Sequence, residues 1–114
     1  MTSAASAPRA LIVGLGKSGL SAARHLSARG WDLAVTDSRE SPPGQSAVRA
    51  LQPGARAAYG RFDLSLLDGV ALVVASPGVA LDEPLMIAAR ERGIEVVGDV
   101  ELFAREVMPV FQRG

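Results

Sequence analysis

Residues 10–19 read Ala-Leu-Ile-Val-Gly-Leu-Gly-Lys-Ser-Gly, and this stretch decides the fold. The run from Ala10 to Val13 is apolar throughout, which is typical of a short strand buried on both faces. Gly14, Gly16 and Gly19 follow in the pattern G-x-G-x-x-G. A glycine-rich turn of this kind joins a parallel strand to a helix, so the sequence predicts an α/β domain.

Each part of the glycine-rich turn has a predicted role. Gly14 permits the tight turn, Gly16 lets a phosphate approach the backbone, and Gly19 allows close packing of helix on strand. The free N–H groups at the helix start, at the positive end of its dipole, favour an anion. Lys17 and Ser18 lie within the same turn. We therefore expect a nucleotide phosphate site here, the alternative being a purely structural turn.

The rest of the chain continues as strands that alternate with helices. Further apolar runs predict strands, and periodic segments that end at glycine or proline predict helices. The expected strands are residues 10–13, 31–36, 56–59, 71–75 and 94–97, and the expected helices are residues 18–29, 46–51, 83–92 and 100–106. This order indicates a single Rossmann-like domain, a doubly wound parallel sheet of about five strands with about four helices.

Asp37 follows the second predicted strand, 18 residues after Gly19. That spacing is close to the ~20 residues expected for the ribose-binding acid of a dinucleotide site. We expect its carboxylate on an exposed rim beside the turn, where Ser38 and Arg39 also lie; Arg39 is suited to stack on a base or contact a phosphate. The alternative is a solvated turn aspartate.

One further stretch, after the fourth predicted strand, is expected to lie beside the site. Ser76, Pro77 and Gly78 end the fourth predicted strand, and their backbone is expected to close the far side of a ligand pocket. His25, in the middle of a helix, is expected to be a surface histidine. No Walker pattern G-x-x-x-x-G-K-[ST] is present in the sequence, so the residues indicate a nucleotide-binding domain without catalytic or metal-binding residues of its own.

The composition of the chain excludes several classes of partner and of chemistry. The 114 residues are 48% apolar and carry twelve basic and twelve acidic side chains, so nothing favours nucleic acid as a partner. There is no cysteine, which excludes disulfides and thiolate chemistry. No apolar run approaches the ~20 residues that a membrane-spanning helix needs. Residues 1–8 lack signal-peptide features, and we expect a flexible segment there. The rest of the chain is expected to be a soluble, cytoplasmic domain.

Four blocks of sequence carry a family resemblance. Residues 13–21, 36–44, 74–79 and 98–103 read VGLGKSGLS, TDSRESPPG, VASPGV and GDVELF. In this order, over about residues 9–107, they resemble the N-terminal domain of the MurD group of Mur ligases, the UDP-N-acetylmuramoyl-L-alanine:D-glutamate ligases of peptidoglycan synthesis. The resemblance implies a Rossmann-like domain that holds the UDP end of the precursor rather than a dinucleotide.

The resemblance also implies roles for individual residues. The backbone at Lys17 and Ser18 would meet the diphosphate, Asp37 with its neighbours would surround the uracil, and Gly78 would lie against the nucleotide from the other side. The full set expected to bind the UDP part is Gly14, Gly16, Lys17, Ser18, Gly19, Asp37, Ser38, Arg39, Ser76, Pro77 and Gly78.

Catalysis would belong to domains beyond this chain. In the complete ligases ATP phosphorylates the precursor's carboxylate, and the amine of glutamate attacks the acyl phosphate to form an amide. Residues 108–114 are expected to be a tail towards an absent ATP-binding domain. The chain alone is therefore expected to be inactive and to bind no cofactor. ATP and Mg²⁺ are expected to be used by the full-length enzyme. The alternatives are the cofactor domain of an NAD-dependent oxidoreductase and a non-catalytic nucleotide-sensing module.

Overall fold

The computed structural model of the chain describes residues 7–80, 82–98 and 102. Strands and helices alternate along these residues, as the apolar runs predict. In chain order the elements are β1 (Arg9–Val13), α1 (Lys17–Ala28), β2 (Asp32–Asp37), α2 (Gln45–Leu51), β3 (Arg56–Tyr59), the 3-10 helix η2 (Leu64–Leu67), β4 (Val70–Ala75), α3 (Pro84–Glu91) and β5 (Glu95–Gly98).

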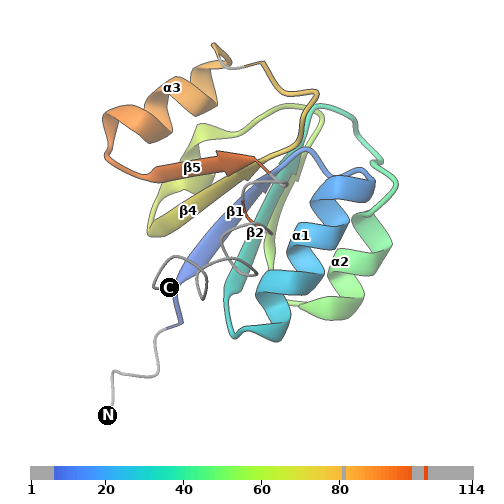
Figure 1. Ribbon diagram of the computed structural model, residues 1–114. Coiled ribbons are helices and arrows are strands. Elements are labelled where there is room, and N and C mark those ends of the chain that lie inside the picture. Colours follow the sequence, from blue (N-terminus) through green and yellow to red (C-terminus); the bar gives the residue numbers. More distant parts are fainter. Residues whose placement is uncertain (1–6, 81, 99–101, 103–114) are drawn as a thin grey trace, which may run out of the picture.

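The five strands form one parallel sheet in the order β3-β2-β1-β4-β5. Helices α1 and α2 cover one face, and α3 covers the other (Figure 1). The register sets Val13, the last residue of β1, beside Thr36 on one side and Ala75 on the other. The carboxyl ends of the three central strands therefore meet at one edge, where the predicted site residues lie.

The alternation of side chains along β1 builds two core layers. Ala10 and Ile12 pack with α1, while Leu11 and Val13 pack with η2 and α3 on the opposite face. All four are fully buried, which explains why this strand is apolar at every position. Burial on both faces makes β1 the rigid element from which the glycine-rich turn leaves the sheet.

The predicted Rossmann-like doubly wound parallel sheet is confirmed, and all five strands lie within one residue of their expected bounds. Sequence reasoning missed η2, whose start is capped by Asp63: its side chain accepts the Ser65 N–H at 2.9 Å. The fourth predicted helix, residues 100–106, lies outside the described residues except for Leu102, which is buried in the layer on the α1 face. Residues 1–6 and the predicted tail 108–114 also lie outside them.

Among the helices of the described residues, none combines the length and apolar character that crossing a membrane requires.

Candidate functional site

The glycine-rich turn leaves the carboxyl end of β1 at the point where the strand order reverses. The chain runs outward from β1 through β2 to β3 and then crosses to β4 and β5 on the other side of β1. Ligands of open α/β sheets bind at such a switch point. Gly14, with φ of +91°, donates its N–H to Thr36 O at 2.8 Å. The first backbone bond of α1 runs from Leu20 N–H to Gly16 O at 2.9 Å.

The first amides of α1 are therefore available to a ligand. The N–H groups of Lys17, Ser18 and Gly19 precede the first intrahelical donor, so no carbonyl within the helix accepts them. They lie at the positive end of the helix dipole. The Lys17 side chain is exposed and Ser18 is half-buried. This end of α1 has the donors and the field that an anionic group such as a phosphate needs.

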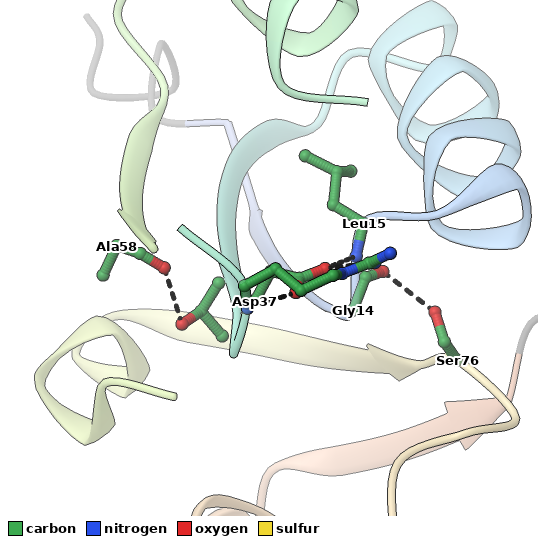
Figure 2. A network of polar contacts seen from close by, with 7 residues as sticks. Gly14, Leu15, Asp37, Ala58 and Ser76 are labelled. Atoms are coloured by element: carbon green, nitrogen blue, oxygen red, sulfur yellow. Dashed lines mark hydrogen bonds and ion pairs between the residues drawn. The ribbon is translucent and has the colours of Figure 1, made fainter. Parts of the chain in front are cut away.

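Asp37 lies in a different setting from the expected one. The exposed rim predicted for it is wrong, because the residue is only 2% exposed. Its Oδ2 accepts the Leu15 N–H at 2.6 Å, which ties the end of β2 to the glycine-rich turn (Figure 2). Its Oδ1 accepts the Arg39 N–H at 2.8 Å. The chain turns back immediately after β2, and this turn closes over the carboxylate.

Arg39 completes the surroundings of that carboxylate. Its Nε donates to Oδ1 of Asp37 at 2.9 Å and its Nη2 donates to Oδ2 at 2.7 Å, a two-pronged ion pair. Burial of Asp37 acts to raise the pKa of its carboxyl, but the hydrogen bonds from Arg39 and Leu15 outweigh burial and hold that pKa at about 2. With four hydrogen bonds, the acceptor sites of this carboxylate are filled.

Ser76 contacts the turn from the β4 side. Its Oγ donates to Gly14 O at 2.9 Å (Figure 2), and its N–H donates to Val13 O at 3.0 Å. Ser76 is half-buried, whereas Pro77 and Gly78 are exposed. The loop after β4 is thus joined to the glycine-rich turn across the switch point.

The three glycines of the motif differ in whether the fold requires a glycine at their positions. Gly14 has a positive φ, and a Cβ there would also lie 2.9 Å from Ser76 Cβ. A Cβ on Gly19 would overlap the carbonyl oxygen of Gly14. Gly16 has φ of −94° in the extended region, and the nearest atom to a Cβ there is Arg39 Nη2 at 3.8 Å. Neither backbone conformation nor packing within the described residues requires a glycine at position 16.

Sequence reasoning missed two supporting contacts. The buried Thr36 hydroxyl lies 3.0 Å from Ala58 O, a contact drawn in Figure 2, and 2.9 Å from Arg61 O. It thus holds β3 and the segment after it against the end of β2. Gly44 donates its N–H to Leu15 O at 3.2 Å and packs on the Leu15 side chain. A polar residue directly before Asp37 in an apolar strand was the available signal for Thr36, while nothing local pairs Gly44 with Leu15.

Residues of the glycine-rich turn line neither of two hollows that lie beside the sheet in the described part of the chain. One of about 360 Å³ lies beside the loop after β4, lined by Ser76, Pro77 and residues of α3 and β5. Another of about 330 Å³ lies at the opposite edge of the sheet, lined by Arg9, Asp32 and Gln52 among others. The predicted nucleotide contacts are on an open edge, so a ligand held there alone would be only partly enclosed.

His25 is half-buried on α1, where its Nε2 accepts from Arg29 Nε at 3.2 Å. No group of three or more histidine or acidic side chains with the geometry of a metal site occurs in residues 7–80, 82–98 and 102. The free amides at the start of α1 suit this edge of the sheet to the binding of an anionic group.

Comparison with known proteins identifies relatives. A sequence model described as the N-terminal domain of MurD-like Mur ligases matches residues 8–98. The UDP-N-acetylmuramoylalanine–D-glutamate ligase of Nitrosococcus oceani is 54% identical over 101 residues, which are 89% of this chain and 22% of that protein. The ligase of the same name from Bordetella pertussis is 47% identical over 113 residues, with 91% and 22% of the two chains covered.

Among solved structures, a pseudomurein peptide ligase type C from Methanothermus fervidus superposes with a TM-score of 0.69 at 20% identity. The match covers 83% of this chain and 20% of that one, and it supports the fold. The chain spans about a fifth of the length of these relatives.

Proposed function

Because the chain belongs to the MurD-like N-terminal domain family of the Mur ligases, we propose that it is the UDP-binding part of a larger ligase. That ligase would add glutamate to UDP-N-acetylmuramoyl-L-alanine, with ATP and Mg²⁺, in peptidoglycan biosynthesis. The names of the bacterial relatives support this activity. The binding domain would extend over residues 9–107, and residues 108–114 would lead towards the ATP-binding domain. The nucleotide-linked precursor and ATP make the cytoplasm the expected location.

The observation that carries the proposal is the glycine at position 16. Its backbone conformation and the space around it accept a side chain, so the fold itself gives no reason for a glycine. A ligand that must approach the backbone closely gives one. The neighbouring amides of Lys17 and Ser18 have no acceptor within α1. A diphosphate seated over Gly16 would accept hydrogen bonds from these amides.

The residues after β2 would define the uracil end of the site. Ser38 and Arg39 are exposed beside the turn and offer polar groups of the kind that match the donors and acceptors of uracil. Asp37 would contribute chiefly by holding Arg39 and the Leu15 amide in place, since its own oxygens already accept four hydrogen bonds. Gly78, exposed after β4, would close the site from the other side, next to Ser76 and Pro77.

The same carboxylate argues against the oxidoreductase alternative. A dinucleotide site needs the acid after the second strand to accept hydrogen bonds from the ribose hydroxyls. Asp37 is buried and its acceptor sites are occupied by Leu15 and Arg39. A ribose would have to displace Arg39 from a two-pronged ion pair before it could bind there.

A titration followed by NMR tests the proposal. UDP and NADH are added separately, at equal concentrations, to isotopically labelled protein. UDP should give saturable shifts at the amides of residues 16–19 and 38–39, at lower concentration than NADH. Tighter binding of NADH at the same amides would favour an oxidoreductase domain, and no saturable shift with either nucleotide would contradict a nucleotide site.

A further inference from the structure

The peptide unit between Gly14 and Leu15 is held at both of its polar ends. Its carbonyl, Gly14 O, accepts the Ser76 hydroxyl at 2.9 Å. Its N–H, on Leu15, donates to Asp37 Oδ2 at 2.6 Å. Figure 2 shows the two side chains reaching this one peptide from opposite sides. Asp37 ends β2 and Ser76 follows β4, so the anchors come from the two strands that flank β1.

This peptide unit depends on such anchors for its orientation. Gly14 has φ of +91° and no side chain, so rotation of the adjoining peptide plane meets little steric resistance. Gly14 and Leu15 are both buried, and a buried carbonyl or amide without a partner is unfavourable. A reversed plane would turn the Gly14 carbonyl away from Ser76 and the Leu15 amide away from Asp37. The two hydrogen bonds therefore select one orientation.

The orientation of this plane affects the amides that follow. Gly16 comes next and α1 begins at Lys17, so the plane sets the direction in which the chain enters the helix. We infer that Ser76 is a positioning residue of the glycine-rich turn, whose hydroxyl acts with Asp37 to fix the Gly14–Leu15 peptide and so aims the amides of Lys17 and Ser18 at a nucleoside diphosphate. The identity of the ligand rests on the proposed function, whereas the anchoring of the peptide does not.

The test removes the hydroxyl and measures the opposite end of the peptide. In Ser76→Ala, hydrogen exchange of the Leu15 amide in ligand-free protein should accelerate by about three- to tenfold, the effect of losing one hydrogen bond. Affinity for UDP, measured by calorimetry, should fall by a similar factor. Ser76→Thr keeps the hydroxyl and should restore both quantities. Ser76→Cys, with a weaker donor of similar size, should give intermediate values.

Ser65 provides the matched control, because it is an exposed serine on η2 whose hydroxyl donates to Asp63 Oδ1 at 2.7 Å. Ser65→Ala should change neither Leu15 exchange nor UDP affinity. Unchanged Leu15 exchange in both Ser76→Ala and Ser76→Cys would overturn the inference, even if UDP affinity fell, because Ser76 would then act by direct contact. Accelerated Leu15 exchange in a protein whose wild type does not bind UDP would support the anchoring and contradict the proposed function instead.

Discussion

Asp37 and Arg39 form an ion pair in which each carboxylate oxygen accepts one guanidinium N–H, at 2.9 and 2.7 Å. The carboxylate side of the pair is buried, while the Arg39 side chain is 53% exposed. The same carboxylate accepts the Leu15 amide of the glycine-rich turn. The pair therefore joins the end of β2, the turn and an exposed cation beside it into one unit.

Replacement of Asp37 should destabilise the domain. Asp37→Asn removes the negative charge from a buried group that accepts charged and backbone donors, so the free energy of unfolding should fall by about 1.5–3 kcal/mol. Urea denaturation followed by circular dichroism measures this change. Asp68→Asn is the control: Asp68 pairs with Arg92 at 3.3 Å and its side chain is 75% exposed, so its loss should be at most about 1 kcal/mol. Equal losses in the two variants would show that the buried ion pair stabilises the fold no more than an exposed one does.

The stability of the domain should depend on pH through the Asp37 carboxylate. The pKa of Asp37 lies at about 2 in the folded chain, below its ordinary value of 3.8. Between these values the unfolded chain binds more protons, so stability rises with pH. The difference in stability between wild type and Asp37→Asn should be full above about pH 5 and shrink as pH falls from 4 towards 2. Urea titrations at several pH values measure it; a difference independent of pH would show that the charge plays no part.

Gly19 should tolerate no side chain, because a methyl group there would overlap the Gly14 carbonyl oxygen. Gly19→Ala should reduce the free energy of unfolding by about 2 kcal/mol or more, despite the better helix propensity of alanine. Thermal denaturation compares it with Gly54→Ala, where a Cβ would meet open space. A stability of Gly19→Ala equal to that of the Gly54 variant would refute the close packing of α1 on the turn.

The chain is expected not to hydrolyse ATP, since its sequence contains no G-x-x-x-x-G-K-[ST] pattern. Phosphate release from ATP should stay at the level of a buffer blank, in a preparation whose folding is verified by circular dichroism. Release above the blank that follows the protein through successive columns would show a catalytic site that the sequence does not reveal.

Much of the fold could be predicted from local patterns, because the strands are apolar runs closed by glycine, proline or a polar residue. The apolar run from Ala71 to Ala75 is an example: it forms all but the first residue of β4, and the strand ends where Ser-Pro-Gly begins. The helix η2 escaped prediction because its four residues show no periodicity and its cap, Asp63, reads equally well as a loop residue.

The candidate site could be predicted in position but not in detail. The spacing from Gly19 located Asp37 at the sheet edge, yet its burial depends on Leu15 and on the turn that brings Arg39 back over it. Likewise, Ser76 is 62 residues from Gly14, and only the parallel pairing of β4 with β1 joins them. Contacts of this kind depend on the three-dimensional assembly and leave no local pattern in the sequence.

In the proposed complex a nucleoside diphosphate approaches the backbone closely at Gly16. The most direct measurement is calorimetric titration of Gly16→Ala with UDP, beside its unfolding free energy. The stability of Gly16→Ala should lie within about 1 kcal/mol of wild type, because the position accepts a Cβ. Its affinity for UDP should fall by about tenfold or more, equivalent to 1.4 kcal/mol, because the methyl group would occupy the place of the phosphate. Unchanged affinity for UDP in a stable Gly16→Ala protein would show that no phosphate approaches this glycine.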